Sequence, residues 1–198
     1  MKYIAKELPK SFALKTGKVK RGLSRLSATR MPRQGQADAV WFGRFHAGPV
    51  VIPCALGRTG ITRDKREGDH ATPAGAFRLL SGFFRVDRGA RLLSLVPMRP
   101  IRPSDGWCDD PSSAVYNRWV RLPSAARHEK LWRADGLYDL VFVLDFNIRP
   151  RHKFKGSAIF LHCARPGYAP TEGCVALRPA DLRRLLPRLS RQVTLTIR

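Results

Sequence analysis

The chain has 198 residues, 43% of them hydrophobic, and a formal net charge of +22. Its length suits one domain with a hydrophobic core plus a short extension. The charge favours a polyanionic partner, such as nucleic acid, an anionic membrane surface or an acidic wall polymer, or it belongs to a solvated basic surface. The sequence has no helix-turn-helix, zinc-finger or aromatic RNA-binding pattern, so nucleic-acid binding is not expected as its main function.

The first residues are the most basic part of the chain. Residues 1–33 hold ten lysines and arginines and one glutamate, a charge of +9, which leaves +13 for the remainder. Residues 1–22 predict a basic, flexible extension, and residues 23–198 predict a single domain. The extension lacks the continuous apolar stretch of a secretory signal, and no later segment is long enough for a membrane span.

Strand patterns occupy the first half of the domain, at residues 23–31, 37–45, 49–57 and 77–86. The first two predict a strand pair, and the third predicts a buried strand.

Two polar segments interrupt these strands. Residues 58–75 are rich in Gly, Asp and Thr and predict a loop. Residues 98–135 are polar and proline-rich, and they predict a long connection without regular structure. Connections of this length usually line a functional site.

The second half of the domain begins with two strand patterns, at 137–146 and 156–165. In the latter, His162 shares a face with Ala158 and Phe160, and the alternate residues face the other way. A helix is predicted from Pro179, because four leucines recur at helical spacing, at Leu182, Leu185, Leu186 and Leu189. Pro187 should end or kink it, and residues 192–197 predict a terminal strand.

The chemistry is predicted to centre on Cys174 and His162. His162 ends a predicted strand, and Cys174 follows Gly173 twelve residues later. A cysteine reacts as its thiolate, which a neighbouring imidazole commonly generates. We therefore expect a Cys174 nucleophile with a pKa well below about 8.5, His162 as general acid and base, and the Gly173 amide as an oxyanion donor.

Three segments resemble the YkuD-type L,D-transpeptidases. That family's catalytic signature is a histidine at a strand end, a loop, then Ser/Thr-x-Gly-Cys, which here is His162 followed by Thr171-Glu172-Gly173-Cys174. GDHATPAGAF at 68–77 is similar to the family's TP-x-G-x-F segment, and residues 106–120 look like a block of a proteobacterial subgroup. The resemblance covers roughly residues 40–185. This chain has Glu172 where the family often has His, and Ala176 where it often has Arg.

The resemblance implies a mainly β (α+β) fold: a YkuD-like β-sandwich of mixed sheets with one helix in the C-terminal region and a long loop on the catalytic side. It implies that Cys174 attacks an L,D peptide bond of a peptidoglycan tetrapeptide stem, forms a thioester and transfers the acyl group to an amine. The backbone carbonyl of Cys163 would orient His162. The periplasm or cell envelope is the expected location, and no cofactor is implied.

Six residues are candidates for substrate binding: Thr171, Glu172, Arg165, Arg178, Tyr116 and Asp109. Asp109 could receive the amine of a diaminopimelate-like acceptor, or it could cap its own turn. Arg165 and Arg178 are candidates for the stem carboxylate, and Tyr116 could line a peptide groove or pack inside the long connection.

Other functions stay open. A thiol hydrolase, such as an L,D-carboxypeptidase or a wall-peptide amidase, would use the same pair with water as acceptor. A basic polyanion-binding protein would leave the cysteine inert. The cysteine spacing matches no zinc ribbon or disulfide framework. Cys54 and Cys163 are expected in the core, Cys108 is ambiguous, and a metal site of His162, Cys174 and another cysteine is a further alternative.

Overall fold

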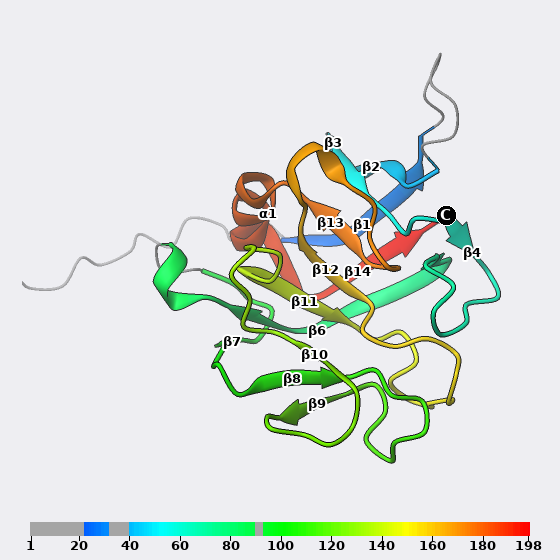
Figure 1. The fold of residues 1–198 in the computed structure, drawn as a ribbon. Coiled ribbons are helices and arrows are strands. Elements are labelled where there is room, and N and C mark those ends of the chain that lie inside the picture. Colours follow the sequence, from blue (N-terminus) through cyan, green and yellow to red (C-terminus); the bar gives the residue numbers. More distant parts are fainter. Residues whose placement is uncertain (1–21, 32–39, 90–92) are drawn as a thin grey trace, which may run out of the picture.

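The computed structural model describes residues 22–31, 40–89 and 93–198, whose course Figure 1 shows. The predicted basic extension, apart from Gly22, lies outside the described residues, and so do residues 37–39 of the second predicted strand.

The first elements in chain order are β1 (Leu23–Arg30), β2 (Phe42–Ala47), β3 (Val50–Ala55), β4 (Ile61–Thr62), β5 (Thr72–Pro73), β6 (Gly75–Phe84), the 3-10 helix η1 (Val86–Arg88), β7 (Met98–Pro100), β8 (Asp105–Cys108), β9 (Arg118–Arg121) and β10 (His128–Lys130). They are followed by β11 (Leu140–Leu144), β12 (Phe160–Cys163), η2 (Pro166–Tyr168), β13 (Val175–Leu177), α1 (Pro179–Leu185), η3 (Leu186–Arg188) and β14 (Leu189–Ile197).

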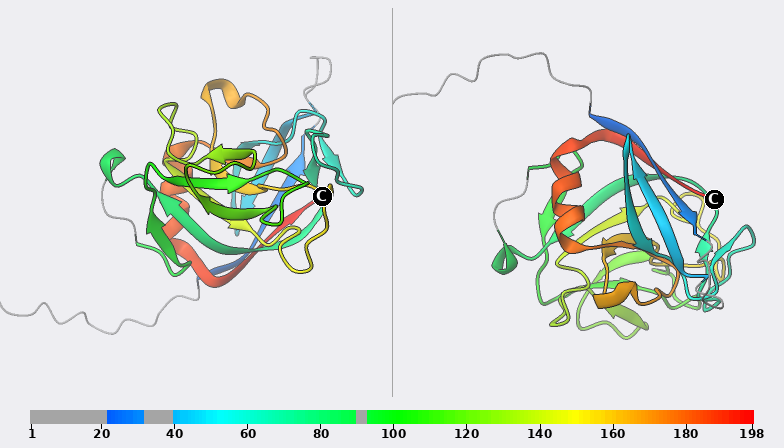
Figure 2. Two further views of the ribbon diagram at one scale, coloured as in Figure 1. Left: turned by 60° about the horizontal axis from the view of Figure 1, so that its bottom comes forward. Right: turned by 90° about the horizontal axis from the view of Figure 1, so that it is seen from above.

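Nine of these strands form one mixed sheet in the order β11-β12-β13-β3-β2-β1-β14-β6-β7. β11 also pairs with β6, which closes the sheet on itself around a shared interior (Figure 2). The strand pairs β1–β14, β12–β13 and β6–β7 are parallel, and the others in this sheet are antiparallel. The fold is therefore mainly β with mixed strand directions and, within the described residues, one α-helix near the C-terminal end, as predicted.

The helix covers the interior of this sheet with its leucine face. All four leucines of the predicted spacing are at most 5% exposed, and α1 contacts β11 and β12. Full burial of one such side chain contributes roughly 1.5–3 kcal/mol. The helix is confirmed from Pro179 onward, and the chain tightens into η3 at Leu186, next to Pro187. Leu189, the last leucine of the predicted spacing, is already the first residue of β14.

The strand predicted over 49–57 forms as β3, but it is only partly buried. Val50 and Val51 are 40% and 50% exposed. β13 pairs with β3 only at Ala55, so the first residues of β3 have β2 as a neighbour on one side and an open edge on the other. Such an edge also accommodates Pro53, which has no amide hydrogen to donate.

The expectation that residues 98–135 lack regular structure is wrong. They contain β7 and a three-stranded antiparallel sheet in the order β10-β8-β9. The short strands are held by polar contacts that no hydrophobic period reveals. The buried Asp105 carboxylate accepts hydrogen bonds from the Arg99 guanidinium at 2.8 and 3.0 Å, from the Arg102 amide at 2.8 Å and from the Trp119 indole at 2.8 Å.

The small sheet packs against β11 and β12 through a second apolar cluster. Trp107 of β8 meets Phe160 of β12 edge to face, with ring centroids 5.3 Å apart. Phe160 and Ala158 belong to this cluster, whereas the alternate residues of the strand, Ile159, Leu161 and Cys163, enter the main core. The predicted division of this strand into two faces is confirmed. Cys174 is part of the second cluster, so the site lies between the two sheets (Figure 1).

None of the helices in the described ranges is long and apolar enough to cross a membrane.

Candidate active site

His162 stands near the end of β12 as a buried, oriented imidazole. It is 3% exposed, and its Nδ1 lies 2.9 Å from the backbone carbonyl oxygen of Cys163. The Tyr138 ring packs edge to face on the imidazole, with centroids 5.4 Å apart. The hydrogen bond places the proton of a neutral imidazole on Nδ1, which leaves Nε2 as the acceptor. The carbonyl predicted to orient His162 makes this contact.

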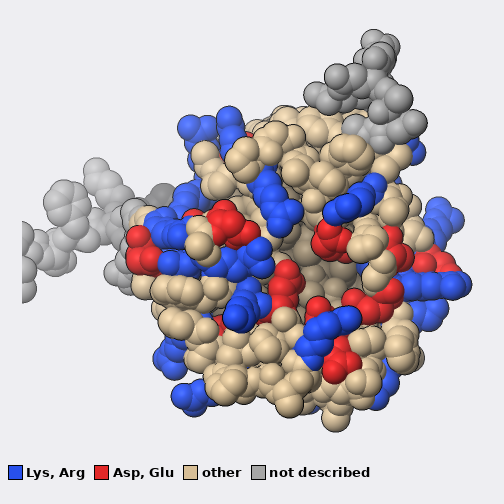
Figure 3. Space-filling model, viewed as in Figure 1, with Lys and Arg blue, Asp and Glu red and all other residues tan. Residues whose placement is uncertain are grey.

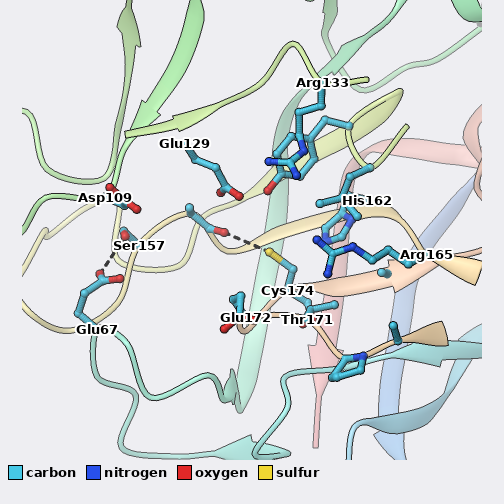
Figure 4. Close-up of a pocket in the computed structure, with 16 residues that line it drawn as sticks. Glu67, Asp109, Glu129, Arg133, Ser157, His162, Arg165, Thr171, Glu172 and Cys174 are labelled. Carbon is cyan, nitrogen blue, oxygen red and sulfur yellow. Dashed lines mark hydrogen bonds between the residues drawn. The ribbon is translucent and has the colours of Figure 1, made fainter. Parts of the chain in front are cut away.

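Cys174 reaches the same cavity from the neighbouring strand. β12 and β13 are parallel, and residues 164–173 connect the end of β12 back to the start of β13, where Cys174 precedes the first residue. Both side chains line a cavity of about 210 Å³ (Figure 4). The Cys174 thiol donates to the Ala158 carbonyl at 3.2 Å and accepts from the Phe160 amide at 3.4 Å.

The Ala158 carbonyl is aimed at the sulfur by an unusual backbone. Ala158 has φ 52, in the left-handed region that non-glycine residues seldom adopt. This conformation also explains why β12 begins at Phe160 rather than near the predicted start. Asn117, which is 2% exposed, stabilises the bend, since its Oδ1 accepts from the Ala158 amide at 3.1 Å and from the Trp107 indole at 2.9 Å.

Gly173 is required by both its conformation and its surroundings. Its φ is 134, and a β-carbon at this position would lie 2.8 Å from the carbonyl oxygen of Ala71. Its amide, however, donates to the Thr171 hydroxyl at 3.2 Å. The role of Gly173 as an oxyanion donor stays a prediction, and in the ligand-free protein its amide hydrogen is bound to Thr171.

Two threonines hold the backbone of Cys174. The Thr171 hydroxyl donates to the Cys174 carbonyl at 2.7 Å, and the Thr72 hydroxyl donates to it at 3.3 Å. Thr72 belongs to the TP segment, so this motif contacts the site directly. Within the same loop the buried Lys65 ammonium forms an ion pair with Asp69, whose carboxylate also accepts from the Ala71 amide at 2.9 Å. These contacts fix the loop against Gly173.

Charge in the cavity is divided between its two sides. Carboxylates from four separate segments line one side: Glu67, Asp109, Glu129 and Glu172. Arg133 and Arg165 line the other side, next to His162 (Figure 4). In the surface view, acidic side chains gather around the central hollow of a face whose periphery is largely basic (Figure 3). The site is thus an acidic pocket in a strongly basic protein.

The protonation state of the pair differs from the expectation. Burial, followed by the negative charge of Glu129, raises the pKa of Cys174 to about 12. Burial also lowers the pKa of His162 to about 4, against the opposing hydrogen bond to the Cys163 carbonyl. The predicted low-pKa thiolate is therefore wrong for the free protein. Near neutral pH the site holds an uncharged thiol and an uncharged imidazole, because desolvation penalises both charged forms.

Four of the predicted substrate-binding residues line the cavity. Asp109 lines the cavity and forms an ion pair with Arg127 at 3.1 Å. Thr171 also lines it, and its hydroxyl donates a hydrogen bond to the Cys174 carbonyl. Glu172 forms ion pairs with Arg58, at 2.9 Å, and with His70.

Arg165 also lines the cavity, and no ion pair of its side chain occurs within the described part of the chain.

Two predicted residues are elsewhere. Arg178 lines a separate cavity and forms two 3.0 Å hydrogen bonds to Asp181, the first acidic residue of α1. Tyr116 is 1% exposed, and its hydroxyl bonds Glu67 rather than opening to the groove. In both cases a nearby carboxylate bonds the polar group: Asp181 holds Arg178, and Glu67 holds Tyr116, which packs inside the long connection, the second of its two predicted positions.

The sequence reasoning missed several cavity residues, namely Glu67, Glu129, Arg133 and Ser157. Three come from segments read as loop or irregular connection. Only the folding of these segments over β12 brings them near Cys174, and no spacing in the sequence signals it.

No group of three or more potential metal ligands occurs among the described residues. All four cysteines are buried and free. Cys54 and Cys163 are in the core as expected, with pKa values raised by burial to about 12 and about 11.

The chain matches known proteins at the level of a family. The model of the YkuD family, described as the L,D-transpeptidase catalytic domain, matches residues 39–197, so the chain belongs to this family. Among solved structures, L,D-transpeptidase 1 of Mycobacterium tuberculosis is similar with a TM-score of 0.35 and 10% identity. The match covers 87% of this chain and 61% of that one. No curated protein sequence matches the chain.

Proposed function

We propose that the protein is a cysteine-dependent peptidoglycan L,D-transpeptidase. The observation that carries the proposal is the shared cavity of Cys174 and His162, in which Nδ1 of the imidazole is bound to the Cys163 carbonyl. This arrangement leaves one imidazole nitrogen able to accept the thiol proton, as nucleophilic catalysis by cysteine requires. Membership of the L,D-transpeptidase family supports a stem-peptide donor.

The acylation step begins from the neutral pair. Cys174 leaves its hydrogen bond to Ala158 and gives its proton to Nε2 of His162 as the sulfur attacks the carbonyl carbon of an L,D peptide bond. The tetrahedral intermediate collapses with cleavage of the C–N bond. The imidazolium then protonates the departing amine, and a thioester on Cys174 remains.

Deacylation repeats the sequence with an acceptor. An amine attacks the thioester carbon, the C–S bond breaks, and the sulfur recovers a proton. We assign the carboxylate of the stem to Arg165, which lines the cavity beside His162, and an amine of a substrate to the acidic side that includes Asp109. Hydrolysis by water, the carboxypeptidase or amidase alternative, differs only in the acceptor.

The proposed substrate, peptidoglycan, lies in the cell envelope. A fusion of an alkaline-phosphatase-type reporter to the C-terminus should be active if the protein reaches it. An inactive reporter at normal protein level would place the protein on the cytoplasmic side and contradict the wall-synthesis role.

A fluorescent amine offered together with purified tetrapeptide stems tests the reaction itself. Incorporation of the amine, with release of the terminal D-amino acid, is expected for the unchanged protein and should be absent from Cys174→Ala. Release without incorporation would identify a hydrolase. A protein that does neither, but is retained on polyanions in a salt-dependent way, would be the basic binding protein instead.

A further inference from the structure

Of the four carboxylates that line the cavity, Glu129 is the one most available to bind a ligand, because the other three are already bound. Asp109 and Glu172 are neutralised by cations, and Glu67 is bound to the hydroxyls of Tyr116 and Ser157. Within the described ranges Glu129 forms no ion pair. Its neighbour is the Tyr138 hydroxyl, which forms a hydrogen bond with it.

The small sheet holds Glu129 rigidly over the reaction centre. Glu129 lies in the middle of β10, directly opposite Trp107 of β8. Directly opposed residues of an antiparallel pair point to the same face. Trp107 packs on Phe160, so this face is the one that meets the catalytic strand. Figure 4 shows the Glu129 side chain on the opposite side of Cys174 from Arg165.

The electrostatics of the pocket agree with this position. Glu129 is close enough to Cys174 for its negative charge to raise the pKa of the thiol. Burial raises the pKa of Glu129 itself, although the Tyr138 hydrogen bond and Arg133 oppose that effect. A largely buried carboxylate without a bound cation is unfavourable, and an arriving ammonium group would relieve this cost.

We infer that Glu129 binds the ammonium group of the acyl acceptor and takes its proton during deacylation. This role rests on the proposed function and specifies its acceptor as a primary amine that is cationic in solution. One proton of the ammonium passes to the Glu129 carboxylate. The neutral nitrogen attacks the thioester carbon, the N–C bond forms and the C–S bond breaks. The second proton passes through His162 to the departing sulfur, and Glu129 then releases its proton to solvent.

Because side chains of opposite charge line the two sides of the cavity, the donor and the acceptor should each bind in one orientation. The donor's carboxylate would lie toward Arg165, and the acceptor's ammonium would approach from the Glu129 side. A carboxylate at this point attracts a cationic amine and repels anionic nucleophiles.

The experiment compares two nucleophiles on the same acyl-enzyme. The acyl-enzyme is formed with a tetrapeptide stem and detected by the mass added to Cys174. It is then treated either with a cationic primary alkylamine or with hydroxylamine, which is uncharged near neutral pH. In Glu129→Gln the reaction with the alkylamine should fall by at least about tenfold, the loss expected for one hydrogen bond to a charged group. The hydroxylamine reaction should fall much less, so the ratio of the two rates should drop by at least about tenfold. Both reactions start from the acyl-enzyme, so a change in the acylation rate through the pKa of Cys174 does not enter the comparison.

Two further variants complete the comparison. Glu129→Asp keeps the charge and should retain the preference for the alkylamine. Asp64→Asn removes one negative charge from an exposed loop outside the cavity and should change neither reaction. Equal losses with both nucleophiles in Glu129→Gln, or no loss with either, would overturn the role. Failure of the unchanged protein to form an acyl-enzyme would overturn the proposed function, and this role with it.

Discussion

Cys174 and His162 form an uncharged pair because both are removed from water. The thiol rests on the Ala158 carbonyl, and the imidazole lies against Tyr138. A thiol in this state is protected from unselective reactions. In the proposed mechanism, activation therefore coincides with substrate binding, when the thiol leaves the Ala158 carbonyl.

Alkylation should report this resting state. Iodoacetamide is expected to modify Cys174 before the other cysteines, because it is 7% exposed whereas Cys54, Cys108 and Cys163 are at most 2% exposed. Because burial raises the pKa of this thiol, the reaction near neutral pH should be slower than that of free cysteine. Peptide mass mapping over time measures the order and the rate. Rapid labelling of Cys174 at mildly acidic pH would show that the thiolate forms in the free protein after all.

His162 should make stability depend on pH. Its folded pKa of about 4 lies below the ordinary value of 6.5, so the unfolded chain binds more protons between these values. The neutral His162 therefore contributes about 3 kcal/mol to the free energy of unfolding. This contribution is fully present above pH 6.5 and is lost as the pH falls to 4.

Urea unfolding at several pH values measures this contribution, with His162→Asn as the control that lacks the titrating group. The unchanged protein should lose more unfolding free energy on acidification than the variant. Parallel pH profiles of the two proteins would contradict the predicted burial of a neutral imidazole.

At the scale of elements, the three-stranded sheet converts a polar segment into one wall of the site. β8 supplies Trp107, which packs on β12, and β10 supplies Glu129. Asn117, between β8 and β9, links the small sheet to the catalytic strand, since its amide group also donates to the carbonyls of Phe146, at 3.2 Å, and Asn147, at 2.8 Å.

Replacing Asn117 should therefore damage both stability and the site. Asn117→Ala leaves the buried Trp107 indole and the Ala158 amide without an acceptor, which should lower the unfolding free energy by about 3 kcal/mol. Asn117→Asp keeps an acceptor oxygen but loses both donors and places a buried carboxylate against the Phe146 and Asn147 carbonyls, so it should be destabilised as well. Chemical denaturation measures both variants, and the acylation rate of Cys174 should fall in each. Equal stability of Asn117→Ala and the unchanged protein would show that the bend at Ala158 is held by other contacts.

At the scale of the whole molecule, a net charge of +22 surrounds a pocket lined by carboxylates. We propose that the exterior attracts anionic polymers through long-range forces that salt screens, and that the acidic wall of the pocket receives an amine. Attachment to a surface and recognition in the site thus depend on opposite charges, and they should respond differently to ionic strength.

The basic N-terminal segment should matter for attachment and not for chemistry. Deletion of residues 1–22 removes seven lysines and arginines against one glutamate, and its apolar residues form no continuous stretch. Turnover of a soluble stem peptide should therefore be unchanged, while adsorption to sacculi at low salt should weaken. Sedimentation with sacculi across a salt series measures adsorption. Loss of folding on truncation would show instead that the segment is part of the domain.

The strands and the helix could be predicted from the sequence because their hydrophobic periods are local. The four leucines after Pro179 and the alternation around His162 each specify a buried face without reference to the rest of the chain. That His162 and Cys174 line one cavity was also predictable, since the two residues flank one short connection between neighbouring strands.

Only the tertiary structure decided what surrounds that pair. Glu129 and Glu67 come from segments far from Cys174 in sequence, and they reach the cavity because the loop and the small sheet fold over β12. The direction of the pKa shifts was decided in the same way. A cysteine beside a histidine predicts a thiolate in water, but burial penalises the charged form of each group, so it raises the pKa of Cys174 and lowers the pKa of His162.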